Sequence, residues 1–139
     1  MDRSSLSDER VAYALLRIVV GVNMTMHGVS RLLLGPAVFT GKLMEQFAHA
    51  PLPSWSVRGF GLMLPFVEGL LGVLLLVGLR TRVALIGAGL LMVMLTFGSA
   101  LVQDWSAAGT QLMYATVFSA LLFLRRYNGF AVDALLDRA

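Results

Sequence analysis

The sequence predicts an all-α membrane protein, a four-transmembrane-helix bundle with both termini cytoplasmic and a long first extracytoplasmic loop. Apolar residues make up 58% of the 139 residues and charged residues only 14%, and the mean hydropathy is +0.79. The apolar residues gather in segments of membrane-spanning length, and most basic residues lie at the ends of these segments. We therefore expect residues 1–139 to form one multi-pass domain in the plasma membrane, in contact with the lipid bilayer.

Four apolar segments are long enough to cross a hydrocarbon core, which takes about 20 helical residues. They cover residues 11–34, 59–79, 83–102 and 110–124. Because only a short turn separates the second from the third, these two helices are predicted to be antiparallel neighbours. The connection 35–58 contains three prolines and is predicted to be an ordered or re-entrant loop. Residues 130–136 are predicted to form a short helix on the inner membrane surface.

The distribution of Lys and Arg predicts the orientation. One side is predicted to hold Arg3, Arg10, Arg80, Arg82, Arg125, Arg126 and Arg138, and the other only Lys42 and Arg58. By the positive-inside rule the first side is cytoplasmic. The first apolar segment is too long and too interrupted for a cleaved signal peptide, so it is expected to be retained as a span.

A polar stripe runs along one face of the first span. At about 100° per residue, the side chains of Arg17, Asn23, His27 and Arg31 share that face. A charged side chain at mid-bilayer costs about 2.5–3.5 kcal/mol, so the stripe should face protein or a wet cavity instead of lipid.

Glu68 in the second span shares its face with small residues, which mark close helix packing and direct the carboxylate into the bundle. Counted from the outer helix ends, Glu68 and His27 lie at the same depth. A nearby Arg31 would keep Glu68 ionised, whereas Arg17 lies deeper and is expected to stretch or snorkel to the cytoplasmic interface. The small residues on the face of Glu68 are Gly61, Pro65 and Gly72.

The predicted ligand-binding residues all lie in the outer half of the bundle. They are His27, Arg31, Glu68, Asn23, Tyr114 and Gln111. Structural roles stay open beside this prediction. Glu68 can form an ion pair that only holds two helices, and His27 can form a hydrogen-bonded clasp with its i±4 neighbours. Arg31 and Tyr114 can serve as interfacial anchors.

The residue types present restrict the chemistry. The chain has no cysteine, which excludes a thiol nucleophile, cysteine-ligated iron–sulfur clusters and covalent c-type haem on this chain. With one histidine in the spans, no metal or covalent cofactor is expected. No nucleic-acid partner is expected either, because the arginines are scattered along the chain. Gly87-Ala88-Gly89 lies mid-span without a preceding strand, so it does not indicate a dinucleotide site.

Several short motifs follow one another along the chain. They are Leu16-Arg17, residues 27–31 (His-Gly-Val-Ser-Arg), the Leu-rich stretch 68–79 that begins at Glu68, the turn 80–84 and the ending 131–136. In this order they resemble the DoxX-like family of membrane proteins. Two departures are Arg31, where a lysine is common, and residues 126–129 in place of a frequent Gly-Pro-Gly turn. The resemblance implies a four-helix membrane bundle related to small membrane subunits of thiosulfate:quinone oxidoreductases.

The leading functional prediction is a small membrane subunit of a quinone-linked redox system, with His27, Arg31 and Glu68 lining a pocket for a quinone. Electrons would come from a protein partner, and a homo-oligomer is the other predicted assembly. Whether the chain is itself catalytic stays open. The alternative is a noncatalytic assembly or stabilising subunit whose polar residues only lock the helices. A small-molecule transporter is the third alternative, although only Pro65 suggests a broken helix.

Overall fold

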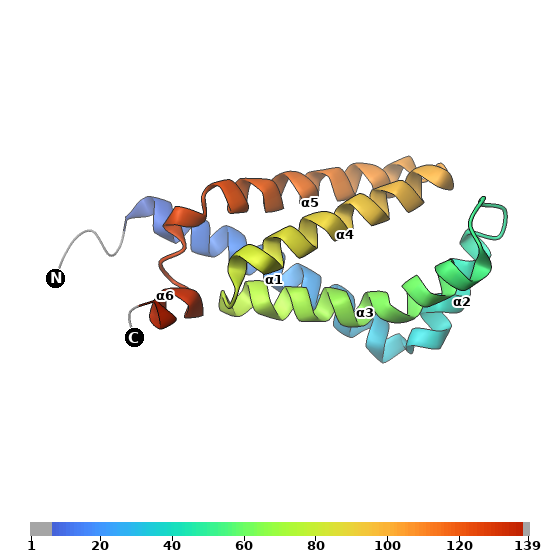
Figure 1. Cartoon of the computed structure of the whole chain (residues 1–139), viewed down its shortest axis with the longest axis horizontal. Helices are drawn as coiled ribbons and strands as arrows, with labels where there is room; N and C mark the ends of the chain where they lie inside the picture. The colour runs from blue at the N-terminus through green and yellow to red at the C-terminus, as the bar shows by residue number, and fades with distance from the viewer. Residues whose placement is uncertain (1–6, 138–139) are drawn as a thin grey trace.

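The computed structural model describes residues 7–137, and in this part of the chain all regular structure is helical (Figure 1). The elements in order are α1 (Asp8–Leu34), α2 (Pro36–Gln46), α3 (Ser54–Val77), α4 (Thr81–Leu101), α5 (Trp105–Phe123), the 3₁₀ helix η2 (Arg125–Tyr127) and α6 (Val132–Leu136). Helices α1, α3, α4 and α5 are long and apolar enough to cross a membrane. The predicted all-α architecture with four spans is therefore confirmed, although α3 and α5 begin about one helical turn earlier than expected.

The connection between the first two spans contains a helix, α2, which the sequence does not predict. Pro36 lies in the first turn of this helix, where its missing N–H would have no partner in any case. Gly35, at φ +98°, separates α1 from α2, and an L side chain rarely adopts that conformation. The proline that indicated a break therefore begins a helix. The short tail helix, in contrast, is confirmed as α6.

Helices α1 and α3 pack at very close range because glycines face the opposite backbone. A Cβ on Gly28 would lie 2.5 Å from the backbone N of Gly69, and a Cβ on Gly72 would collide with the backbone of Thr25. Close approach through small residues is the usual way to pair helices in a membrane. This contact confirms that the Glu68 face of α3 packs against the first span.

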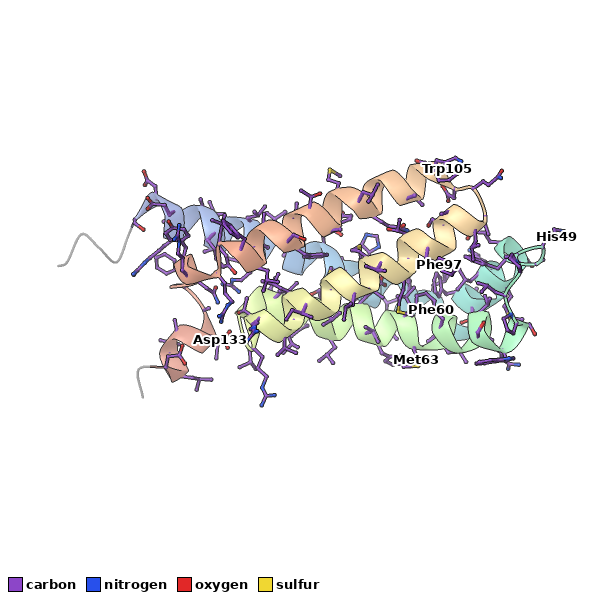
Figure 2. The ribbon with its side chains drawn as sticks, turned by 45° about the horizontal axis from the view of Figure 1, so that its top comes forward. His49, Phe60, Met63, Phe97, Trp105 and Asp133 are labelled. Atoms are coloured by element: carbon purple, nitrogen blue, oxygen red, sulfur yellow. The ribbon has the colours of Figure 1, made fainter. Side chains whose placement is uncertain are left out.

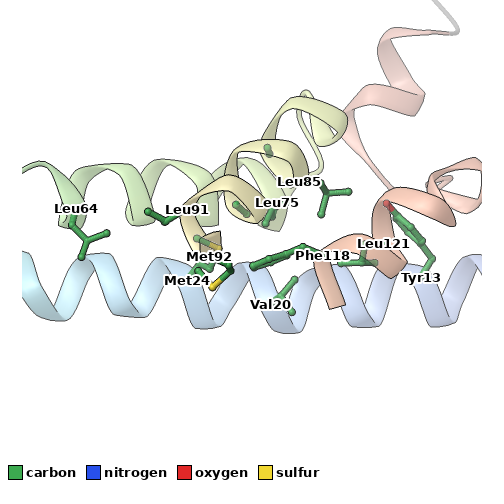
Figure 3. Close-up of a cluster of buried hydrophobic side chains, with 12 residues drawn as sticks. Tyr13, Val20, Met24, Leu64, Leu75, Leu85, Leu91, Met92, Phe118 and Leu121 are labelled. Carbon is green, nitrogen blue, oxygen red and sulfur yellow. The ribbon is translucent and has the colours of Figure 1, made fainter. Parts of the chain in front are cut away.

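The buried core lies toward one end of the bundle. Figure 3 shows Leu75, Leu85, Phe118 and Leu121 gathered there with Tyr13 of α1. The buried residues of α4 all lie between Thr81 and Met92, and none lies in its last nine residues. We call this end the α6 end, since it also holds the turn 78–80 and residues 124–137. The opposite end, which holds α2 and residues 102–104, is the α2 end. Toward it α4 and α5 separate from α1 and α3 (Figures 1 and 2).

Arg17 closes the α6 end of the bundle. Its side chain is 2% exposed, and its guanidinium donates hydrogen bonds to the carbonyl oxygens of Leu75, Leu76 and Phe130. These acceptors include carbonyls at the C-terminus of α3, where a helix lacks its own donors and favours a cation. The expectation that Arg17 snorkels to water is wrong, because backbone carbonyls replace the water.

Asp133 fastens the tail to the turn between α3 and α4. Its carboxylate accepts hydrogen bonds from the backbone N of Arg80 at 2.6 Å and of Thr81 at 2.7 Å, so it caps the N-terminus of α4. Partial burial by itself raises the pKa of Asp133. The hydrogen bonds from Thr81 and Arg80 and the charge of Arg125 outweigh burial and lower this pKa below its ordinary value.

Candidate ligand-binding site

The predicted site residues line one cavity of about 230 Å³, which we call the polar cavity. Helix α1 presents three of them at intervals of four residues, which places them on one face. Helix α3 adds the carboxylate and α5 adds an amide and a phenol. The six residues are Asn23, His27, Arg31, Glu68, Gln111 and Tyr114. The structure thus brings all six together, while their binding of a ligand stays a prediction.

An ion pair between Arg31 and Glu68 forms one wall of the polar cavity. Glu68 is 4% exposed, and a carboxylate removed from water needs a paired cation or hydrogen-bond donors to stay charged. The Arg31 guanidinium also lies over the ring of Phe39, 4.7 Å from its centroid, a favourable cation–π geometry. The predicted pairing of Arg31 with Glu68 is therefore confirmed.

Three polar side chains around the cavity keep free hydrogen-bonding capacity. Within residues 7–137, the side chains of Asn23, His27 and Tyr114 take part in no hydrogen bond, although they line the cavity. The alternative of a clasp between His27 and its i±4 neighbours is wrong, because Arg31 reaches across to Glu68 and His27 stays exposed. These side chains are available to a ligand or to water.

Gln111 lies where α4 and α5 meet. Its Nε2 donates a hydrogen bond to Oγ of Ser99 at 2.9 Å, whereas its buried Oε1 has no partner among the described residues. A buried acceptor without a donor costs about 1–3 kcal/mol. A ligand hydroxyl or a water molecule that donates to this oxygen would remove that cost.

A second and mainly apolar cavity of about 400 Å³ adjoins the first, and we call it the apolar cavity. Its walls include Phe39 and Leu43 of α2 and Phe47 directly after this helix, together with Leu52, Phe60 and Phe97. Sequence reasoning missed it because residues 35–58 were interpreted as a loop. The sequence does indicate this apolar wall, since Phe39, Leu43 and Phe47 recur every four residues, as on one apolar face of a helix.

The side chains at the site suit an organic ligand with hydrogen-bonding groups. The cavity offers donors from Arg31, His27 and Gln111 and an acceptor from Gln111. Within residues 7–137, no group of three His, Asp or Glu side chains is arranged to hold a metal ion.

A family model described as methylamine utilisation protein MauE matches residues 9–112. The match spans α1 to α4 and the first part of α5, so it includes five of the six site residues, all but Tyr114. No curated protein and no solved structure matches the chain. The resemblance to the DoxX-like family is wrong, since the matching model is that of a different membrane family. The motifs that carried it consist largely of small and apolar residues and turn residues, which many membrane helix pairs need.

Proposed function

The chain belongs to the MauE family of membrane proteins, and from this premise and the two cavities we propose that it is a membrane subunit of a quinone-linked redox system. In this proposal the polar cavity holds the quinone head group. The single observation that carries the proposal is the convergence of six polar side chains from three membrane helices on one cavity. Polar groups at membrane depth are costly and mark functional sites by default.

The hydrogen-bonding groups of the cavity match both redox forms of a quinone. The oxidised ring has two carbonyl acceptors, which Arg31, His27 and Gln111 can reach as donors. The reduced ring has two hydroxyl donors, for which the unpartnered Oε1 of Gln111 is a ready acceptor. Glu68 keeps the Arg31 cation in the cavity wall, and histidine is the side chain type suited to proton exchange near neutral pH.

Electrons would come from a partner protein in this proposal, because the chain has no cysteine to ligate an iron–sulfur cluster. We propose that the α6 end lies in the cytoplasm, since besides the buried Arg17 it holds five basic residues of the described chain. They are Arg10, Arg80, Arg82, Arg125 and Arg126. Labelling of single cysteines at Arg82 and Ser106 from each face of the plasma membrane tests this orientation, and outside access at Arg82 would contradict it.

An assembly subunit is the second candidate, favoured by one observation. Arg31 and Glu68 already neutralise each other without a ligand, as a pair that only locks α1 to α3 would. A transporter gains no such support, since α3 continues without a break through Pro65 and lacks the discontinuous helix typical of such sites.

Measurement of bound quinone and melting temperature on the same purified proteins separates the two candidates. We expect His27→Ala and Gln111→Leu each to lower quinone retention about tenfold, the loss for one or two hydrogen bonds. The melting temperature of His27→Ala should stay unchanged, because His27 is exposed. That of Gln111→Leu should change little, because the lost hydrogen bond to Ser99 is offset by removal of the buried, unpartnered Oε1. Met26→Ala is the control, since Met26 is exposed on α1 and lines neither cavity.

Two outcomes would contradict the quinone proposal. Normal quinone retention in both variants would remove the polar cavity as the site. Wild-type protein purified from quinone-containing membranes without any quinone would favour the assembly subunit instead.

A further inference from the structure

The apolar cavity has no part in binding a quinone head group, yet it is the larger of the two cavities. At about 400 Å³ it falls within the roughly 300–1,000 Å³ of ordinary small-molecule sites. We infer that it holds the hydrocarbon tail of the ligand whose head group lies in the polar cavity. The ligand class is then a quinone with an isoprenoid or alkyl tail, taken from the bilayer. This inference rests on the proposed function and names the class of ligand.

The lining of the apolar cavity suits a flexible hydrocarbon chain. Four phenylalanine rings line it, namely Phe39 of α2, Phe47 directly after α2, Phe60 of α3 and Phe97 of α4. Burial of apolar ligand surface against such rings is favourable in proportion to the area removed from water. Polar side chains such as Gln46 and Asp104 also line the cavity, but most of its lining residues are apolar.

The two cavities share part of their lining. Arg31, Leu95, Ala107 and Gln111 line both of them. The same Arg31 lies against Glu68 on its polar side and over the ring of Phe39 on its apolar side. A single amphiphile can therefore extend from one cavity into the other past Arg31, with its head group at Glu68 and its tail beside α2.

The position of the apolar cavity indicates entry from the lipid. Phe97 lines it and is 60% exposed, and Phe97 belongs to a helix that is apolar enough to span the membrane. Figure 2 shows Phe97 of α4 and Phe60 of α3 at the same level, close to α2. Exposed apolar side chains at the mouth of a cavity favour a ligand that is dissolved in the bilayer.

Helix α2 forms a wall of this cavity and is held in place on α3. Thr40 is buried and packs so closely on Gly61 that a Cβ on Gly61 would lie 2.9 Å from Oγ1 of Thr40. The side chain of Leu43, next along this face of α2, lines the cavity. A larger side chain at position 43 would occupy the space of the tail and leave the polar cavity untouched.

Tail-length dependence of binding tests the inference. We expect wild-type protein to bind decylubiquinone at least about tenfold more tightly than the tail-less ubiquinone-0, because the tail buries apolar surface. Leu43→Trp should reduce this ratio to about threefold or less, with ubiquinone-0 binding unchanged. The matched control is Leu33→Trp, the same change at an exposed position that lines neither cavity.

A second measurement does not depend on the folding of the tryptophan variant. Ser56 lines the apolar cavity, and the chain has no other cysteine to react. We expect decylubiquinone to protect Ser56→Cys from a membrane-permeant maleimide, whereas ubiquinone-0 and decanol at equal concentration should not. Protection by decanol alone would show a site for any alkyl chain and would overturn the inference.

Different binding results would contradict the tail site and the head-group site. Equal affinity for decylubiquinone and ubiquinone-0 would overturn the tail site and leave the head-group site standing. No binding of either quinone would overturn both.

Discussion

The two ends of the bundle use the same residue type, an arginine of α1, in opposite ways. At the α6 end, Arg17 is enclosed and donates to three backbone carbonyls. At the α2 end, Arg31 pairs with one carboxylate, and its side chain keeps 24% of its surface exposed beside two cavities. A buried cation bound to backbone carbonyls holds elements together, whereas a cation paired with one side chain at a cavity can also meet a ligand.

The packing differs between the ends in the same way. Phe118, Leu121 and Leu85 fill the space between helices near the α6 end, and the tail residues cover the turn 78–80. Near the α2 end the helices separate and leave the polar and the apolar cavity between them. The tightest packing and the proposed ligand site thus lie at different ends, and substitutions at each end should have different consequences.

The largest expected effect is at Arg17. Arg17→Ala should lower the free energy of unfolding by about 3 kcal/mol, since it leaves buried carbonyl oxygens without donors. Arg17→Lys should also destabilise, by about 1–2 kcal/mol, because an ammonium cannot spread over three separated acceptors as a guanidinium does. Arg82→Ala at the same end is the control, since Arg82 is exposed. Thermal unfolding in detergent measures the stability of all three variants. If Arg17→Lys were as stable as the wild type, the side chain at position 17 would be hydrated and not dependent on the three carbonyls.

A smaller loss of stability is expected at Glu68. Glu68→Ala leaves the Arg31 cation without its partner and should lower the free energy of unfolding by about 1–3 kcal/mol. Glu68→Gln should cost less because it retains an acceptor. The double variant Arg31→Ala/Glu68→Ala should be more stable than Glu68→Ala, because the unpaired charge is gone. Equal unfolding temperatures of wild type and Glu68→Ala would argue that this carboxylate is solvated and unpaired.

The smallest expected effect is at Asp133. Asp133→Asn removes the anionic cap of α4 and should lower the free energy of unfolding by about 1 kcal/mol at pH 7. The folded pKa of Asp133 lies below its ordinary value. Its contribution is therefore present above the unfolded pKa of about 4 and is lost as the pH falls through the folded pKa. Unfolding at pH 7 and below pH 3 measures this, with the exposed Asp137→Asn as control. A stability difference between Asp133→Asn and wild type that persists unchanged at low pH would contradict the assignment.

Local pattern predicted much of the fold and of the candidate site. The lengths of the apolar segments predicted four spans. Helical spacing, together with the depth of each residue in its span, predicted that Asn23, His27 and Arg31 lie near Glu68, and all four line one cavity. Local pattern failed for Arg17, whose carbonyl acceptors on Leu75, Leu76 and Phe130 are distant in sequence. The alternative clasp of His27 does not form, because Arg31 pairs with Glu68 on another helix, as the sequence predicts. Pro36 was interpreted as a break because its position in a first turn depends on the conformation of Gly35.

The sequence by itself determined the membrane class, the four spans and the face on which each polar residue lies, because these depend on hydrophobicity and on 3.6-residue periodicity. Only the tertiary structure decided that Arg17 binds the end of α3 and the tail, and that α2 walls an apolar cavity beside Arg31. The physical reason is that hydrogen-bond partners and cavities arise between helices. They depend on helix separation, which Gly28 and Gly72 set at one interface and which no single helix contains.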